Sequence, residues 1–284
     1  MAARYMARPQ ASITWASYAL PPTRANLPST AETCVSAPPD CLVDLGHSRV
    51  KWACGQAGQV IAGTASACPV EALEDLDQAL RNMTGAPAMR RAVLSGQSNP
   101  EVVDAVSVRL HRAGLSLHAV TTGTPTLSVQ PAYEQLGCDR WLALQWPWLE
   151  QQQGFCVIDC GTAITVDLVD DSGVHLGGWI MAGLGSLQHG LLSRARRLPK
   201  PAGDDIDLAR PATESARAIA AGTLLQAVGG IEQALLRCEA LLGRSLIPWL
   251  GGGDAGRIAA QLPRPVRRDD DLVLRGLALA AEAL

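Results

Sequence analysis

One pattern, an apolar strand that ends in Asp-X-Gly and opens a hairpin, occurs twice in this 284-residue chain and constrains its fold more than any other feature. The first copy is DLGHSRVK, which begins at Asp44, and the second is DCGTAITVD, which begins at Asp159. Each copy opens a set of three expected strands that is followed by helices. A pattern repeated at matched positions predicts a duplicated domain.

Strand and helix patterns alternate along the rest of the chain. Strands are expected in CLVDL, SRVKWAC, GQVIAGTA, RRAVLSG, LSLHAVTT, FCVIDC, AITVDLVDD, VHLGGWIM and SLIPWL. Helical spacing covers 68–83, 99–114, 213–242 and 271–284, and the segment 137–154 is expected to be helical in its first half and broken at Pro147. This alternation predicts an α/β fold, with an N-terminal domain over 41–135 and a C-terminal domain over 136–284.

Residues 1–40 differ from the rest of the chain in composition. They hold six of the 18 prolines, show little periodicity and carry three arginines before the first acid, Glu32. Ser and Thr interrupt the apolar stretch after Arg8, which makes it a poor signal-peptide core. We therefore expect a disordered or over-long N-terminal extension, with a signal or transit peptide as the alternative.

Charge and cysteine usage exclude several function classes. The net charge is −3, so neither nucleic acid nor an anionic membrane is expected as a partner. No window approaches the roughly 18 uninterrupted apolar residues of a spanning helix. The eight cysteines form no C-x-x-C pair, which leaves zinc and thioredoxin-like sites without support and favours a reducing compartment, the cytoplasm.

Phosphate binding is the chemistry that needs two such hairpins. Glycine lets the backbone approach a ligand and point its N–H groups into a concavity. The hydroxyls of Ser48, Thr162 and Thr165 can donate to phosphate oxygens, and Lys51 can add a positive charge. A carboxylate at the strand end can hold a hydrated cation such as magnesium. One Asp-X-Gly turn would most simply be a plain hairpin, whereas two facing hairpins predict a nucleoside triphosphate clamp.

A third glycine-rich junction lies near the C-terminus. The stretch WLGGGDAGRIAA, residues 249–260, predicts a strand, a glycine triplet and a helix with Asp254 as N-cap. Bare backbone at this junction would let an adenine ring lie flat against it. The alternative is an ordinary tight turn with a helix cap.

These pieces, in this order, resemble the acetate and sugar kinase, heat-shock chaperone and actin superfamily. Within it, residues 41–284 resemble the type III pantothenate kinases. The segments that carry the resemblance are GCDRW at 137–141, DCGTAITVD, GGWIMAG, ATESARAIAAG with Thr213, GGGDA at 251–255 and LVLRGLALA. The resemblance implies two duplicated actin-like (ribonuclease H-like) domains with a nucleotide cleft between them. It also implies ATP-dependent phosphorylation of pantothenate to 4'-phosphopantothenate, the first step of coenzyme A biosynthesis. The implied partners are a second copy of the chain, a monovalent cation (potassium or ammonium) and magnesium with the nucleotide.

The resemblance also implies roles for individual residues. The first phosphate loop would consist of Asp44, Leu45, Gly46, His47, Ser48, Arg49, Val50 and Lys51. Thr162 would contact the nucleotide phosphates and Asp159 would bind the monovalent cation. The pantothenate pocket would be lined by Gly137, Cys138, Asp139, Arg140, Thr213 and Tyr133, with Asp139 as the general base. A carboxylate that orients the attacking hydroxyl suits phosphoryl transfer, although an Asp-Arg pair also occurs as a structural ion pair.

Three positions depart from the family pattern. His47 replaces the usual asparagine, Ala182 replaces a proline, and Gln130 stands where a substrate-facing tyrosine is expected, with Tyr133 as its possible replacement. Two other functions stay open: another kinase of the same superfamily, and a non-catalytic nucleotide-binding regulator. The histidines at 111, 118, 175 and 189 show no ligand spacing and are interpreted as surface or satisfied core residues.

Overall fold

The structure is a computed structural model that describes residues 38–46, 49–67, 77–78, 89–96, 100–124, 127–202 and 206–284. All of them belong to the compact unit Ser36–Leu284. Residues 1–37 of the extension expected over 1–40, most of the helix expected at 68–83, and His47 and Ser48 lie outside the described residues. The extension was predicted slightly too long, because Asp40 is already the first residue of strand β1.

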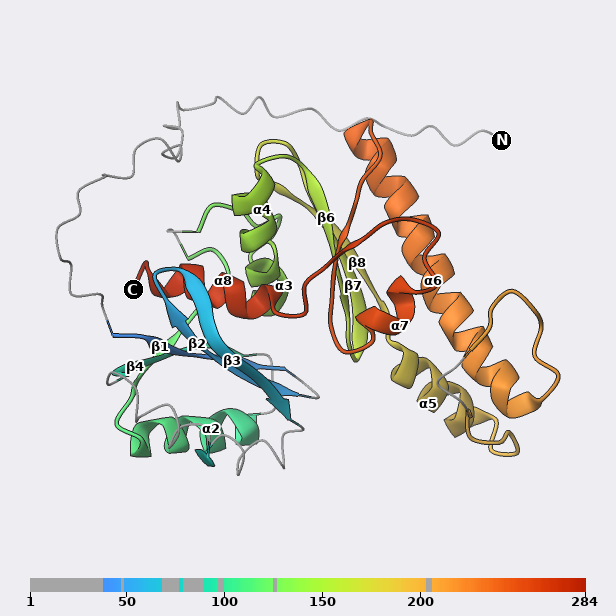
Figure 1. The fold of residues 1–284 in the computed structure, drawn as a ribbon, viewed down its shortest axis with the longest axis horizontal. Helices are drawn as coiled ribbons and strands as arrows, with labels where there is room; N and C mark the ends of the chain where they lie inside the picture. Colours follow the sequence, from blue (N-terminus) through green and yellow to red (C-terminus); the bar gives the residue numbers. More distant parts are fainter. Residues whose placement is uncertain are drawn as a thin grey trace, which may run out of the picture. The chain divides into compact units, whose positions relative to one another are not determined.

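Two five-stranded sheets of the same topology form the framework (Figure 1). The first has the order β3-β2-β1-β4-β5 and the second the order β10-β9-β6-β7-β8. The first sheet consists of β1 (Asp40–Leu45), β2 (Val50–Gln56), β3 (Gln59–Ala67), β4 (Arg91–Gly96) and β5 (Ser116–Ala119). The second consists of β6 (Phe155–Cys160), β7 (Ala163–Val169), β8 (His175–Ala182), β9 (Trp249–Gly251) and β10 (Arg267–Arg268).

Strand pairing repeats between the two sheets. In each, the first three strands form an antiparallel meander, and the first strand also pairs in parallel with a later one, β4 or β9. Asp44 and Asp159 are each the penultimate residue of that first strand. The duplication predicted from the two Asp-X-Gly hairpins is therefore confirmed, and with it the α/β fold class.

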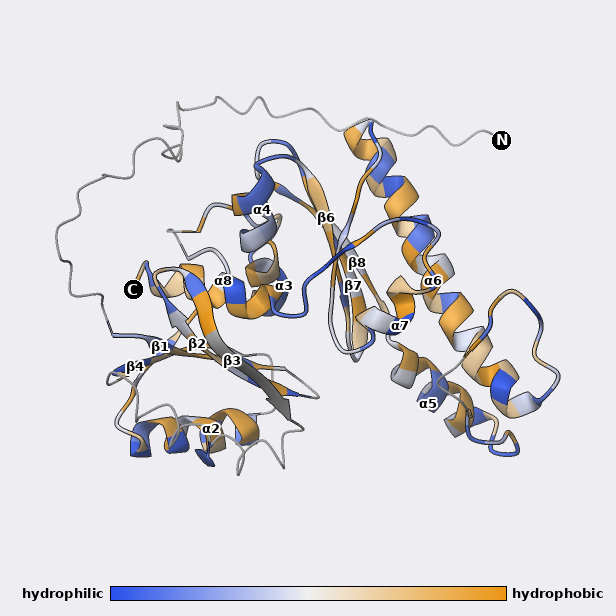
Figure 2. Cartoon of the chain, viewed as in Figure 1, coloured by the Kyte–Doolittle hydropathy of each residue, from blue (hydrophilic) through white to orange (hydrophobic). Residues whose placement is uncertain are grey.

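Helices cover both faces of the first sheet. Helix α2 (Pro100–Arg112) packs on one face through Val106 and Leu110. The other face carries α3 (Cys138–Ala143) and the C-terminal helix α8 (Leu272–Ala281), and α4 (Gln145–Gln151) follows α3. In Figure 2 the apolar residues of α2 lie on the side that faces the strands, as expected for an amphipathic helix.

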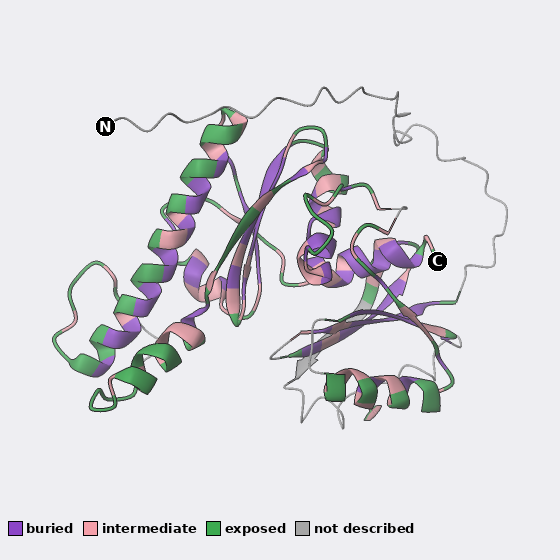
Figure 3. Cartoon of the chain, turned by 180° about the vertical axis from the view of Figure 1, so that it is seen from behind, coloured by how far each residue is buried: buried purple, intermediate pink, exposed green. Residues whose placement is uncertain are grey.

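The second sheet packs on the long helix α6 (Ser215–Leu242), and α5 (Leu184–Arg194) and α7 (Ala255–Ala259) lie beside it. Helix α6 is long and apolar enough to cross a membrane by length and composition alone. Half of its apolar window is buried inside the protein, because residues such as Ile231 and Leu235 fill the core under the sheet. Buried and exposed residues alternate along it in Figure 3, which is the pattern of a core helix.

Three local expectations need correction. Pro147 does not break its helix: it lies in the first turn of α4, where its missing N–H would have no partner in the helix, and the interruption falls at Leu144. Asp254 occupies the N-cap position of α7 but makes no side-chain capping hydrogen bond. Helix α6 begins at Ser215, so Thr213 precedes it.

Candidate active site

Side chains alternate between the two faces of a strand, and this alternation places both predicted aspartates on the faces of β1 and β6 that are covered by α3, α4 and α8. In β1, Cys41, Val43 and Leu45 pack toward α2, so Leu42 and Asp44 face α3 and α8. In β6, Cys156, Ile158 and Cys160 pack toward α6. Phe155 and Val157 face the opposite side and contact Ala143, Leu144 and Leu272, so Asp159 lies on that side as well.

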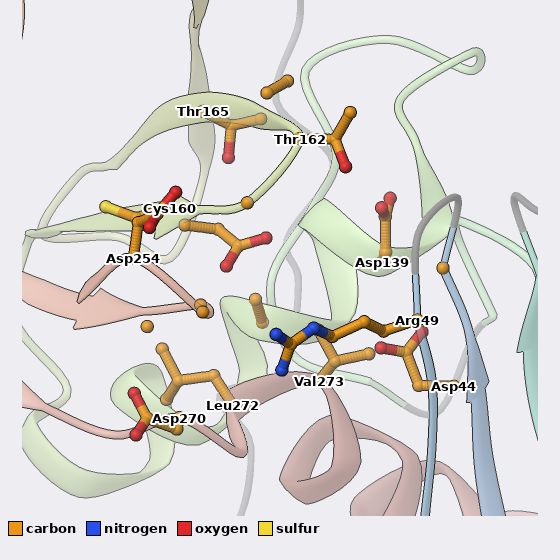
Figure 4. A pocket seen from close by; sticks show the side chains of 18 of the residues that line it. Asp44, Arg49, Asp139, Cys160, Thr162, Thr165, Asp254, Asp270, Leu272 and Val273 are labelled. Atoms are coloured by element: carbon orange, nitrogen blue, oxygen red, sulfur yellow. The ribbon is translucent and has the colours of Figure 1, made fainter. Parts of the chain in front are cut away.

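A cavity of about 750 Å³ opens where these faces meet (Figure 4). The first hairpin supplies Asp44, Gly46, Arg49 and Lys51, and the second supplies Asp159, Cys160, Gly161, Thr162, Ala163 and Thr165. The rest of the lining is Asp139, Ala143, Val157, Gly185, Ser186, His189, Gly190, Gly251, Gly252, Gly253, Asp254, Asp269, Asp270, Leu272 and Val273. Its volume lies in the range typical of small-molecule and cofactor sites.

Three carboxylates interact in this cavity. Asp44 is half-buried, and the hydroxyl of Ser95 on β4 donates to its Oδ1 at 2.7 Å. Burial raises the pKa of Asp44 to about 6, against the Ser95 hydrogen bond and Lys51, which lower it, and with help from Asp139 and Asp159. The pKa of Asp159 is also raised, first by burial and then by Asp139, although Lys51 opposes the shift. A positive ion or a cationic side chain would therefore be strongly attracted here.

Two basic side chains extend from the first hairpin into the cavity. Lys51 lies opposite Asp44 in the β1–β2 register, and its Nζ donates to the carbonyl oxygen of Asp270 at 2.8 Å. Figure 4 shows Arg49 reaching across the cavity. Its guanidinium lies against Gly253, where an added Cβ would be 3.8 Å from the Arg49 Cζ. The positive charge of Arg49 therefore lies beside the glycine triplet Gly251–Gly253.

In both hairpins the turn glycine donates a backbone hydrogen bond that closes the turn, to the third residue after it in the first hairpin and to the second residue after it in the second. The N–H of Gly46 donates to the carbonyl of Arg49 at 3.0 Å, and the N–H of Gly161 donates to that of Ala163 at 2.9 Å. Gly252 has φ +95° and lies so close to β6 that an added Cβ would be 2.5 Å from the Cys160 carbonyl and 2.6 Å from the Asp159 Oδ1. Only glycine fits there without moving Asp159.

Helix α5 contributes its N-terminal turn, with Gly185 and Ser186 in the cavity lining. The N–H of Gly183 and the hydroxyl of Ser186 both donate to the carbonyl of Thr162, at 3.0 and 2.7 Å. These bonds hold the second hairpin turn against the positive end of the helix dipole. A hairpin turn and a helix N-terminus that face one cavity are well suited to bind phosphate.

Asp139 lies in the first turn of α3 and projects into the cavity, as Figure 4 shows. Its Oδ1 accepts the backbone N–H of Arg140 at 2.8 Å. Gly137 occupies the N-cap position directly beneath it, where a Cβ would be 2.7 Å from the same oxygen. Glycine at 137 therefore leaves room for the Asp139 carboxylate.

Arg140 points away from Asp139, toward β7. Its Nε and Nη2 donate to Asp167 at 3.0 and 2.6 Å, and its Nη1 donates to the Tyr133 hydroxyl at 3.1 Å. Burial lowers the pKa of Arg140, but its bonds to Asp167 outweigh this effect and raise the pKa above its ordinary value. Asp167 also contacts the buried His175.

The structure brings only part of the predicted site together. Asp44, Gly46, Arg49, Lys51, Asp139, Asp159 and Thr162 line one cavity. Leu45 and Val50 are buried in the core, so they can offer a ligand only their backbone. Cys138 is buried with its Sγ 3.1 Å from the Val120 carbonyl, and burial raises the pKa of its thiol to about 12. Gly137, Arg140, Tyr133 and Thr213 do not line the cavity.

Several cavity residues were missed from the sequence. Gly185 and Ser186 could have been found, because small residues in the first turn of a helix after a strand are typical of anion sites. His189 lines the cavity, which the sequence interpretation of the histidines did not anticipate. Leu272 and Val273 come from the C-terminal helix; their segment LVLRGLALA helps to carry the family resemblance, but its apolar pattern is that of a core helix and indicates no place in the site.

A resident metal cage is absent from the described part of the chain. No three His, Cys, Asp or Glu side chains there come close enough to hold a metal ion by themselves. A cation at Asp44 or Asp159 would need further oxygen ligands, such as those of a phosphate chain. The donor set therefore fits a cation that arrives with, or is completed by, a bound nucleotide.

Comparison with known proteins agrees with this geometry. Residues 41–237 match the family model of the type III pantothenate kinases. A type III pantothenate kinase from Alkalilimnicola ehrlichii is 35% identical over 246 residues, which cover 84% of this chain and 96% of the relative. One from Pseudomonas paraeruginosa is 34% identical over 255 residues, which cover 84% and 97%.

Solved structures show the same fold at low identity. A putative Baf family transcriptional activator from Campylobacter jejuni has a TM-score of 0.55 at 18% identity, covering 86% of this chain and 98% of that one. The ethanolamine utilization protein EutJ from Carboxydothermus hydrogenoformans has a TM-score of 0.53 at 14% identity, covering 86% and 90%. The family match and the curated relatives together assign the sequence: this chain belongs to the type III pantothenate kinase family.

Proposed function

We propose that this protein transfers the γ-phosphoryl group of ATP to the primary hydroxyl of pantothenate, which gives 4'-phosphopantothenate, the first step of coenzyme A biosynthesis. The observation that carries the proposal is the convergence of Asp44, Asp139 and Asp159 in one cavity of a chain from this family. Phosphoryl transfer needs mainly positioning and charge stabilisation, and the cavity supplies both.

Nucleotide binding is assigned to the two hairpins and to the N-terminal turn of α5. Backbone N–H groups near Gly46 and Thr162, together with the positive charges of Arg49 and Lys51, would bind the phosphate oxygens. His47 and Ser48 belong to the same loop in this proposal. Bare backbone at Gly251–Gly253 and the apolar side chains of Leu272 and Val273 would face the adenine.

Asp139 is proposed as the general base. It would accept the proton of the pantothenate hydroxyl while that oxygen attacks the γ-phosphorus, and it would orient the hydroxyl beforehand. Arg140, Tyr133 and the backbone at Gly137 and Cys138 would bind the rest of the substrate. Because Asp139 and Arg140 are successive residues of α3, their side chains diverge by about 100° and can reach different parts of one substrate.

Cations are proposed at two carboxylates. Magnesium would enter bound to the nucleotide phosphates beside Asp44, and a potassium or ammonium ion would bind at Asp159. Both aspartates lie near Asp139, and their pKa values are raised first by partial removal from water and then by the neighbouring carboxylates, while Lys51 opposes the shift. A bound cation would supply the missing positive charge.

The working form is proposed to be a cytoplasmic homodimer. Helix α6 and strand β8 expose large apolar side chains to solvent, among them Leu225, Leu236, Trp179 and Ile180. A shallow groove of about 290 Å³ joins the two elements. Exposed apolar surface of this kind favours a protein interface. Thr213, which does not line the cavity of its own chain, would then contribute to the substrate site of the partner.

The test is a coupled assay of ADP release with pantothenate as acceptor, with and without potassium, and identification of the product by mass spectrometry. Formation of 4'-phosphopantothenate at the rate of ADP release would support the proposal. A chain that binds ATP but does not consume it with pantothenate would be a nucleotide-binding regulator. Turnover with a sugar or acetate in place of pantothenate would make it another kinase of the superfamily.

A further inference from the structure

Arg140 is held along one edge by a buried carboxylate. Its Nε and Nη2 donate to the two oxygens of Asp167, so the pair is bidentate. The Asp167 side chain is 2% exposed and that of Arg140 is 10% exposed. Nη1 donates to the hydroxyl of Tyr133, a residue that is 45% exposed to solvent. Three of the five guanidinium N–H groups are thus engaged by described residues, and the open end of the group lies beside Tyr133.

His175 supports Asp167 from behind. Its Nε2 lies 2.9 Å from the Asp167 Oδ1, the oxygen that also accepts from Arg140 Nη2. An ionised carboxylate can only accept, so Nε2 carries the proton and donates. The other ring nitrogen, Nδ1, is buried and has no hydrogen-bond partner among the described residues. Of the two ring nitrogens, Nε2 is thus the one that bonds to a described residue, and that residue is Asp167.

The backbone around this pair is shaped for it. Gly178 lies opposite Asp167 in the β7–β8 register, and a Cβ there would be 2.7 Å from the Asp167 Oδ1. Backbone hydrogen bonds join Gln130 to Gly173 and to His175, at 3.0 and 2.9 Å. This link brings the Tyr133 ring within 6.3 Å of the His175 ring. The cluster Tyr133–Arg140–Asp167–His175 is therefore a closed ring of contacts.

We propose that Asp167 and His175 are positioning residues that fix Arg140 as a binding group for the carboxylate end of the substrate. The inference rests on the proposed function and refines it. Pantothenate carries its reacting hydroxyl at one end and a carboxylate at the other. With the Nε edge fixed on Asp167, the remaining N–H groups of Nη1 and Nη2 keep one orientation and can donate to a carboxylate. Asp139, one residue earlier, serves the hydroxyl end.

The test compares pantothenate with its uncharged primary amide by titration calorimetry in the presence of a non-hydrolysable ATP analogue. The variants are Asp167→Asn, which keeps the shape but removes the charge, and the matched pair His175→Leu and His175→Gln. The Gln Nε2 can replace the donor of the imidazole, whereas Leu cannot. Asp171→Asn is the control, because its ion pair with Arg244 is an exposed one at the β7–β8 turn.

For Asp167→Asn we expect the Kd of pantothenate to rise about 10- to 100-fold, the range found when the hydrogen-bond partner that orients a metal ligand is removed. The Kd of the amide and that of the ATP analogue should change less than about threefold. His175→Leu should show a smaller loss of the same kind, and His175→Gln should recover it. Asp171→Asn should behave as the wild type.

Equal losses for pantothenate and for the amide would overturn the inference, and so would a His175→Leu variant with unchanged discrimination. If Asp167→Asn does not fold, the two His175 variants decide the question, with thermal unfolding and binding of the ATP analogue as checks on the fold. Wild-type protein that binds pantothenate but does not phosphorylate it would contradict the proposed function and leave this test intact.

Discussion

Three half-buried aspartates carry the chemistry proposed for this chain, and each differs from the others in its surroundings. Asp44 shares a hydrogen bond with Ser95, Asp139 accepts the N–H of the next residue, and Asp159 lies against Gly252. Burying several carboxylates together costs free energy of folding, and proteins accept such a cost mainly at functional sites.

The first prediction concerns Asp139. Asp139→Asn keeps the shape of the side chain but removes the proton acceptor. Loss of a general base typically costs about 10² to 10⁴ in rate, so kcat should fall at least about a hundredfold. The affinity for ATP and the unfolding temperature should change little. A folded Asp139→Asn protein with near-normal kcat would show that this residue is not the base.

The second prediction concerns the pH dependence of stability at Asp44. Its pKa rises from 3.8 to about 6 on folding, so the folded state binds more protons than the unfolded state between those values. Stability contributed by this group is therefore lost as the pH rises through that window. Without nucleotide or magnesium at pH 7, the free energy of unfolding of Asp44→Asn should exceed that of the wild type by up to about 3 kcal/mol. The variant should therefore also unfold at a higher temperature. The gain should vanish near pH 4.

The control for that experiment is Asp171→Asn. The Gly154 N–H and Arg244 lower the pKa of Asp171, so its contribution has the opposite sign and is present at neutral pH. Thermal unfolding of both variants from pH 4 to pH 8 makes the comparison. A destabilised Asp44→Asn protein at pH 7 would mean that the ionised carboxylate is stabilised by its surroundings after all.

The third prediction concerns the cation at Asp159. At constant ionic strength, activity should rise when potassium or ammonium replaces sodium, because a carboxylate beside a phosphate chain repels it unless a cation lies between them. Asp159→Asn should blunt this response. Full activity in sodium alone, with no gain from potassium, would remove the assignment. Thermal shifts on adding potassium to the ATP complex give a readout that does not depend on turnover.

At the scale of elements, two Asp-X-Gly hairpins and their strands were predictable because alternation and turn chemistry are local. The α/β class, both hairpins and the glycine triplet followed from such signals. The parallel pairing of β1 with β4, which places Ser95 beside Asp44, is long-range, and no local signal reports it. The interruption at Leu144 was placed wrongly at Pro147, because proline was read as a breaker where the first helical turn tolerates it.

The fourth prediction tests the glycine triplet as an element of the site. Gly252→Ala places a methyl group 2.5 Å from a carbonyl oxygen at φ +95°, so the unfolding temperature and the affinity for ADP should both fall. Gly190→Ala is the matched control for stability, because its Cβ would meet nothing within 4 Å and a helix favours alanine. Its unfolding temperature should stay the same or rise. Wild-type stability of Gly252→Ala would contradict the strained geometry.

At the scale of the whole molecule, the C-terminal helix packs on the sheet that contains the first described strand, β1. Helix α8 packs on the first sheet through Leu274, Leu277 and Ala278. Arg91 on β4 pairs with Asp40 and donates to the carbonyl of Ala281. The domain boundary near residue 135 stays a prediction. The sequence could not indicate that residues 272–281 complete the core of the N-terminal sheet, since only tertiary packing determines it.

The last prediction concerns assembly. If the face formed by α6 and β8 is the dimer interface, the wild type should have the mass of two chains by light scattering at micromolar concentration. Ile180 is 65% exposed at that face, so Ile180→Glu should give monomers, because it would bury a charge in an apolar contact. The monomer should still bind ATP, since the nucleotide cavity lies within one chain. It should lose pantothenate turnover, since Thr213 would come from the partner.

Leu149→Glu on α4, 50% exposed, is the control and should stay dimeric. A monomeric wild type with full activity would remove both the dimer and the role of Thr213, whereas a dimeric Ile180→Glu protein would place the interface on another face.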